Sequence, residues 1–156
     1  MGLKGVPSII SPDLLKALAE MGHGDNIVIA DAHFPAHSLG RRGPLVIRAD
    51  GVKYIADMMA AILKLIDLDA YVPNPVKIMD LTDDDKKKGI LKTPLPVWQQ
   101  YIDIASKSSN GQKFSLGYVE RFEFYEQAAG AFVIVLTSDT TLYGNVMLSK
   151  GVLPVE

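Results

Sequence analysis

The sequence of 156 residues contains no cysteine and only one tryptophan. The absence of cysteine excludes disulfide bonds and thiolate chemistry of any kind. No run of about eighteen apolar residues is present, so no membrane-spanning helix is expected. The N-terminal stretch MGLKGVPSIISPDLL also lacks the apolar core and cleavage site of a secretory signal. These absences predict a soluble protein with a cytoplasmic location.

The chain also lacks an excess of charge of either sign. Its 16 lysines and arginines against 18 acidic residues give a formal net charge of -2, which offers no electrostatic reason to expect nucleic acid. The one dense basic run, Lys86–Lys88, directly follows three aspartates, Asp83–Asp85, so their charges largely cancel. With 48% hydrophobic and 22% charged residues, the composition is typical of a globular protein. The length predicts a single domain over residues 1–156.

Short apolar runs alternate with helical patterns along the chain. Ser11 as N-cap and Pro12 in the first turn predict a helix that ends at Gly22, and NIVIA at 26–30 predicts a buried strand. Further helices are expected at 50–66, 96–106 and 120–129, and further strands at 45–49, 76–79, 131–138 and 143–148. The alternation predicts an α/β fold, a single layered domain with a central, mainly parallel sheet flanked by helices.

All three histidines, His23, His33 and His37, lie in the stretch EMGHGDNIVIADAHFPAH at 20–37. They have three interpretations. The first is that they are turn and loop residues with local hydrogen bonds, and the second is that they are metal ligands. The third is that they include a proton-transfer group beside Asp31 at the end of the expected strand. The interpretation as a metal site is weakened, because the sequence has neither the spacing H-x-x-H or H-E-x-x-H nor a clear third ligand. Proton transfer needs no cofactor, and ligands gather beyond the carboxyl ends of strands in open α/β sheets.

No other reactive machinery is visible. The sequence has no phosphate-binding G-x-x-x-x-G-K motif, no dinucleotide-binding G-x-G-x-x-G motif and no nucleophile elbow. We therefore expect proton transfer on a small polar molecule.

Four segments resemble the family of fucose mutarotases, to which the ribose pyranase also belongs. They are ISPDLLKALAEMGHGDNIVIADAHFPAHS at 10–38, IRADG at 47–51, RFEFYEQA at 121–128 and LYGNVMLSKGV at 142–152. The stretch from about 74 to 113 matches less clearly. The resemblance implies a cofactor-independent interconversion of the α and β anomers of a free sugar, with L-fucose as the first substrate to consider.

The resemblance also implies roles for particular residues. His23 corresponds to the family's proton donor or acceptor, and Asp69 to an aspartate implicated in animal members. Arg121 corresponds to a sugar-contacting arginine. His33 and His37 are expected at a loop or pocket rim. The full expected set is His23, Asp31, Asp69 and Tyr143 for catalysis, and Asp31, Arg121, Tyr125, Tyr143, Gly144 and Asn145 for substrate binding.

The family resemblance further implies a homo-oligomer, a decameric ring in bacterial members, with pockets near subunit boundaries. The segment Tyr143–Asn145 is then expected to complete a neighbour's pocket. Three other functions remain open at this point: pyranose–furanose conversion as in the ribose pyranase, non-catalytic monosaccharide binding, and metal-dependent hydrolysis. The RFEFYE and YGN segments resemble the fucose branch of the family rather than the ribose branch.

Overall fold

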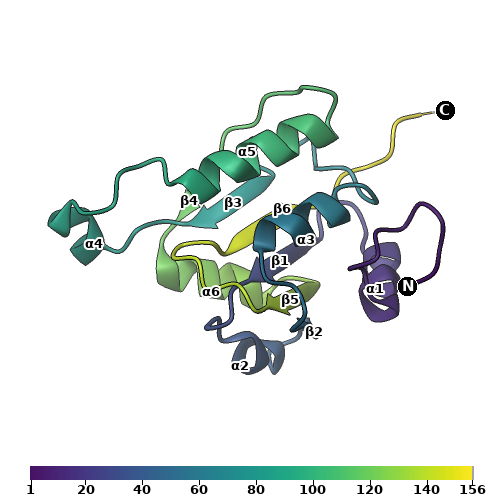
Figure 1. The fold of residues 1–156 in the computed structure, drawn as a ribbon, viewed down its shortest axis with the longest axis horizontal. Coiled ribbons are helices and arrows are strands. Elements are labelled where there is room, and N and C mark those ends of the chain that lie inside the picture. The colour runs from purple at the N-terminus through teal and green to yellow at the C-terminus, as the bar shows by residue number, and fades with distance from the viewer. Residues whose placement is uncertain (156) are drawn as a thin grey trace.

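A six-stranded sheet with the strand order β2-β5-β1-β6-β3-β4 forms the centre of the computed structural model, which describes residues 1–155 (Figure 1). The strands are β1 (Asn26–Ala30), β2 (Leu45–Ala49), β3 (Val76–Met79), β4 (Gly117–Val119), β5 (Val133–Thr137) and β6 (Val146–Ser149). Strand β6 is antiparallel to β1 and β3, and the other pairings are parallel. The expected mainly parallel α/β sheet is confirmed.

Helices cover both faces of this sheet. They are α1 (Pro12–Glu20), α2 (Ala36–Gly40), α3 (Ile55–Ile62), α4 (Asp83–Lys88), α5 (Pro96–Ser108) and α6 (Arg121–Ala129). Helices α1, α3 and α5 share a core with Ile27 and Ile29 of β1, whereas α2 and α6 share a second core with Val28 and Ala30. Successive strand residues point to opposite faces, so a strand buried on both faces is a continuous apolar run.

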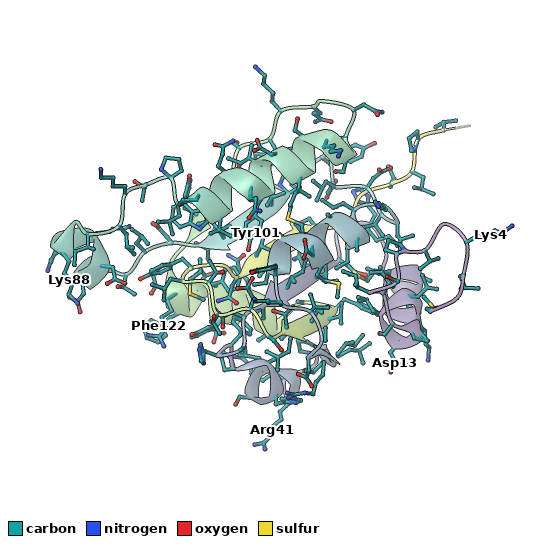
Figure 2. The ribbon with its side chains drawn as sticks, viewed as in Figure 1. Lys4, Asp13, Arg41, Lys88, Tyr101 and Phe122 are labelled. Atoms are coloured by element: carbon teal, nitrogen blue, oxygen red, sulfur yellow. The ribbon has the colours of Figure 1, made fainter. Side chains whose placement is uncertain are left out.

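Helix α4 differs from the other helices. None of its residues is buried, and it projects beyond the edge of the sheet, with Lys88 near its outer tip (Figures 1 and 2). Within residues 1–155, no helix has both the length and the apolar character needed to cross a membrane.

The start of α1 follows the sequence prediction. The Ser11 hydroxyl accepts a hydrogen bond from the backbone N–H of Leu14 at 3.1 Å, and Pro12 is the first helical residue. Such an N-cap contributes about 1 kcal/mol to helix stability. Leu14 and Leu18 are buried, so the apolar side of the helix lies on the sheet.

Helix α3 begins later than its sequence pattern indicates. The expected helix started near residue 50, but the first helical residue is Ile55, whose backbone N–H donates to Asp139 Oδ2 at 2.7 Å. Asp139 is buried and comes from the loop after β5, 84 residues further along the chain. The cap of α3 is therefore a tertiary contact that local sequence does not reveal.

The buried face of α5 also differs in part from expectation. Trp98 is buried as expected, but Ile102 and Ile104 are only half-buried. Tyr101 and Ala105 fill the core instead. Trp98, Tyr101 and Ala105 follow one another at the three- and four-residue spacing of one helix face.

Gly151 packs against the backbone of Leu68, next to Asp69. A Cβ atom at Gly151 would lie 2.4 Å from the carbonyl oxygen of Leu68. We expect Gly151→Ala to lower the free energy of unfolding by about 1–3 kcal/mol, because a rigid backbone atom must move. Thermal unfolding measures this loss. Gly51→Ala is the control, since its Cβ would meet nothing within 4 Å. Equal melting temperatures for the two variants would contradict the close packing.

Candidate active site

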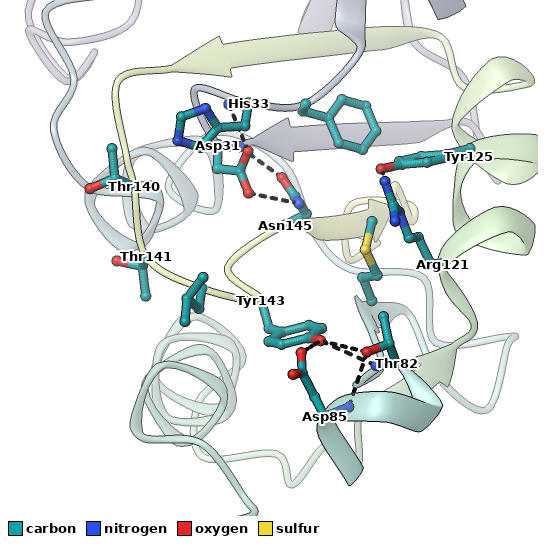
Figure 3. A pocket seen from close by; sticks show the side chains of 13 residues that line it. Asp31, His33, Thr82, Asp85, Arg121, Tyr125, Thr140, Thr141, Tyr143 and Asn145 are labelled. Carbon is teal, nitrogen blue, oxygen red and sulfur yellow. Dashed lines mark hydrogen bonds between the residues drawn. The ribbon is translucent and has the colours of Figure 1, made fainter. Parts of the chain in front are cut away.

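A polar cavity of about 400 Å³ opens beside the carboxyl ends of β1, β3 and β5 and the start of β6 (Figure 3). This is the edge at which open α/β sheets bind their ligands. The volume is within the range of roughly 300–1,000 Å³ found for small-molecule sites. The lining includes Asp31, Arg121, Tyr125, Tyr143 and Asn145, which therefore come together as the sequence analysis expected.

Two hydrogen bonds join Asp31 and Asn145 in the lining of this cavity. The backbone N–H of Asp31 donates to Asn145 Oδ1 at 2.7 Å, and Asn145 Nδ2 donates to Asp31 Oδ2 at 3.0 Å. The backbone N–H of His33 donates to Asp31 Oδ1 at 2.9 Å. Burial raises the pKa of Asp31 despite these hydrogen bonds. The carboxylate keeps free lone pairs, so it can accept hydrogen bonds from ligand hydroxyls.

Helix α6 supplies the cationic and aromatic side of the cavity. Its N-cap, Glu120, accepts hydrogen bonds from two backbone N–H groups, which fixes the start of the helix. Arg121 and Tyr125 lie one turn apart, and Arg121 Nε donates to the Tyr125 hydroxyl at 3.2 Å. This hydrogen bond raises the pKa of Arg121, so the guanidinium stays charged. Its remaining N–H groups can bind hydroxyls in a planar fork.

The segment Tyr143–Gly144 is held away from strand geometry. Tyr143 has a φ of +56°, and its carbonyl oxygen accepts from Trp98 Nε1 at 3.0 Å. The carbonyl oxygen of Gly144 accepts from the Tyr101 hydroxyl at 2.5 Å. Strand β6 therefore begins at Val146, not at the expected residue 143. Gly144 lies in this turn and, contrary to expectation, is not part of the cavity lining, whereas Tyr143 points its ring into the cavity (Figure 3).

His23 and Asp69 form a second polar pair. His23 Nε2 lies 2.9 Å from Asp69 Oδ1, and the same oxygen accepts the backbone N–H of Tyr71 at 2.9 Å. The Tyr71 hydrogen bond, aided by the His23 ring, holds the pKa of buried Asp69 below its usual range. An anionic partner orients the imidazole through the hydrogen bond that it accepts. Asp25 holds the turn that carries His23, as expected, by accepting from Gly22 N–H.

The two polar groups lie at opposite ends of β1. His23 precedes this strand and Asp31 follows it, and five strand residues at ~3.3 Å each span about 17 Å. The structure therefore does not bring His23 together with Asp31 within one chain. His33 lines the cavity, as expected for a rim residue, whereas His37 contacts Arg48 at 3.1 Å and is not part of the lining.

Thr82 and Asp85 also line the cavity but were not among the expected site residues. The sequence had indicated only that the charges of Asp83–Asp85 largely cancel those of Lys86–Lys88. The available signal was the spacing of a threonine and an acidic residue three positions later, which is typical of a helix start. Thr82 indeed accepts from the backbone N–H of Asp85 at 3.3 Å. Among residues 1–155, no three histidine, cysteine, aspartate or glutamate side chains are grouped as a metal site requires.

Comparisons with known proteins cover nearly the full chain. The sequence profile of the RbsD / FucU transport protein family matches residues 4–153. The chain is 50% identical to fucose mutarotase of Homo sapiens over 156 residues, which are 100% of this chain and 97% of the human protein. It is 44% identical to L-fucose mutarotase of Glaesserella parasuis, over 98% of this chain and 97% of that protein.

Solved structures agree with these sequence matches. The fucose mutarotase of Streptococcus pneumoniae in complex with L-fucose has a TM-score of 0.84 and 39% identity, covering 97% of this chain and 100% of that chain. Bacillus subtilis RbsD complexed with D-ribose has a TM-score of 0.67 and 24% identity, covering 99% and 100%, and shares the fold.

Proposed function

Because the chain belongs to the RbsD / FucU transport protein family, we propose that it is a mutarotase that interconverts the α and β anomers of L-fucose without a cofactor. The observation that carries the proposal is the convergence of Asp31, Arg121 and Tyr143 on one cavity of suitable size. The 50% identity to human fucose mutarotase over the full chain further supports the proposal.

Anomer exchange requires little machinery. One group gives a proton to the ring oxygen while another accepts the proton of the anomeric hydroxyl, and the bond between the anomeric carbon and the ring oxygen breaks. Rotation of the open-chain aldehyde and closure on its other face reverse both transfers. A well-placed proton-transfer group accelerates such a step by roughly 10²–10⁴-fold.

The side chains of the cavity suit a monosaccharide. Asp31 accepts sugar hydroxyls, Asn145 holds the Asp31 carboxylate in place, and Arg121 donates in a fork. The rings of Tyr125 and Tyr143 offer apolar faces to the C–H groups of the sugar and hydroxyls to its oxygens. In this proposal these residues bind and orient the ring.

The proton donor comes from a second copy of the chain. Within one chain, His23 lies at the far end of β1, so it reaches a sugar only if a neighbouring copy presents it with Asp69. Exposed apolar side chains support such a contact, because Tyr71 beside His23 is 77% exposed and Phe122 and Leu142 near the cavity are 67% and 68% exposed. Two different surfaces in contact generate a ring of copies when the rotation from one copy to the next closes. The decamer and the cytoplasmic location remain predictions.

A panel of sugars tests the function. NMR saturation transfer between anomers is measured for L-fucose, D-galactose and D-ribose, with and without protein. We expect the largest acceleration for L-fucose. If the protein accelerates exchange between the pyranose and furanose signals of D-ribose, the result would favour the pyranase alternative. Sugar-induced shifts without faster exchange of any sugar would favour the non-catalytic binding protein.

The rate of anomer exchange is expected to vary with pH as the Asp31 carboxyl gains or loses its proton. Since burial raises its pKa above the ordinary value of 3.8, exchange should fall with decreasing pH while free aspartates are still ionised. Stability responds in the opposite direction. The contribution of Asp31 to folding is fully present below its unfolded pKa and is lost as the pH rises through the raised pKa. Exchange that persists down to the ordinary aspartate range would contradict the role of Asp31.

A further inference from the structure

One hydrogen-bonded cluster connects α4 to the cavity. The hydroxyl of Tyr143 donates to Asp85 Oδ2, and the backbone N–H of Thr82 donates to the Tyr143 oxygen at 3.2 Å (Figure 3). Both α4-side residues line the cavity beside Tyr143. No residue of α4 is buried. Apolar packing therefore does not explain why the Asp85 carboxylate of this helix lies against the Tyr143 hydroxyl.

The cluster fixes the direction of the phenolic proton. A phenol has one proton to donate, and an ionised carboxylate only accepts, so the proton of Tyr143 is directed to Asp85. The Tyr143 oxygen can then only accept from other groups. It accepts the N–H of Thr82, whereas the Thr82 hydroxyl, at 3.4 Å, lies beyond the usual range of about 2.5–3.0 Å for O–H···O bonds. Acceptor capacity therefore remains for a ligand hydroxyl.

We propose that Asp85 is a positioning residue that makes Tyr143 an obligate hydrogen-bond acceptor for the anomeric hydroxyl of the sugar. The proposal rests on the mutarotase function. As the ring opens, the proton of the anomeric hydroxyl passes to the Tyr143 oxygen while the phenolic proton passes to Asp85, so the hydrogen bonds along this path strengthen in the transition state. An interaction that strengthens in the transition state raises kcat more than it lowers KM.

The test compares two adjacent aspartates of α4. Asp85→Asn replaces the carboxylate by a neutral amide, which can donate to the phenol oxygen as well as accept from it and cannot take up the phenolic proton. We expect kcat for L-fucose anomer exchange to fall by about 10-fold to 100-fold, with KM changed by less than about twofold. Asp84→Asn makes the same change of charge at an exposed position outside the cavity lining, and should leave both constants unchanged.

A second background separates positioning from a structural role. In a Tyr143→Phe protein, Asp85→Asn should cause no further loss, because Asp85 acts only through the phenol. Equal losses in both backgrounds, or a lowered melting temperature of Asp85→Asn alone, would overturn the role. Unchanged exchange in Asp85→Asn would overturn it while leaving the mutarotase function intact. If the unmodified protein exchanges no anomers, the mutarotase function fails and the role of Asp85 fails with it.

Discussion

Replacement of His23 by alanine is expected to slow L-fucose anomer exchange by about 10²–10⁴-fold, the contribution of one placed proton-transfer group. The side chain is 41% exposed, and within residues 1–155 its one side-chain hydrogen bond is to Asp69, so the fold should not depend on it. Saturation-transfer NMR gives the exchange rate, and thermal unfolding gives the stability of the same preparation.

The control for this prediction is His37→Ala. His37 is exposed and bonded to Arg48, away from the cavity lining, so its loss should leave exchange unchanged. Full activity in His23→Ala would remove this histidine from the mechanism. A low melting temperature of that variant would instead make the residue structural.

Mixing two inactive variants is expected to restore activity. Arg121→Ala damages the cavity, and His23→Ala damages the proton donor, which lies at the other end of β1. If each site combines the cavity of one copy with the histidine of its neighbour, random co-assembly leaves about a quarter of the sites intact. Equal amounts of the two proteins are co-refolded, and exchange is measured per subunit against each variant alone.

A matched mixture controls for unspecific recovery. His23 and Asp69 belong to the same polar pair, so a mixture of His23→Ala and Asp69→Ala contains no intact donor pair and should stay inactive. Recovery in both mixtures, or in neither although mixed oligomers are present, would contradict a site shared between two copies.

Much of the fold could be predicted from sequence because its signals are local. The cap formed by Ser11 and Pro12 marks the start of α1, and uninterrupted apolar runs such as VIVLT mark strands buried on both faces. The cavity residues Asp31, Arg121 and Asn145 could be anticipated from the family resemblance together with the rule that ligands gather at strand ends.

What could not be predicted depends on contacts between distant segments. Asp139 caps α3 from 84 residues away, and Trp98 holds the carbonyl of Tyr143, so β6 starts late. Sequence proximity suggested that His23 acts beside Asp31, yet the length of β1 separates them. Asp85 could not be recognised as a site residue, because only the folded chain brings α4 to the phenol of Tyr143.

The most direct measurement of the central claim is saturation transfer between the anomeric protons of α- and β-L-fucose in the presence of the purified protein. A mutarotase gives an exchange rate that rises in proportion to protein concentration and far exceeds the rate in buffer alone. An exchange rate equal to that in buffer, with a folded protein in the tube, would contradict it.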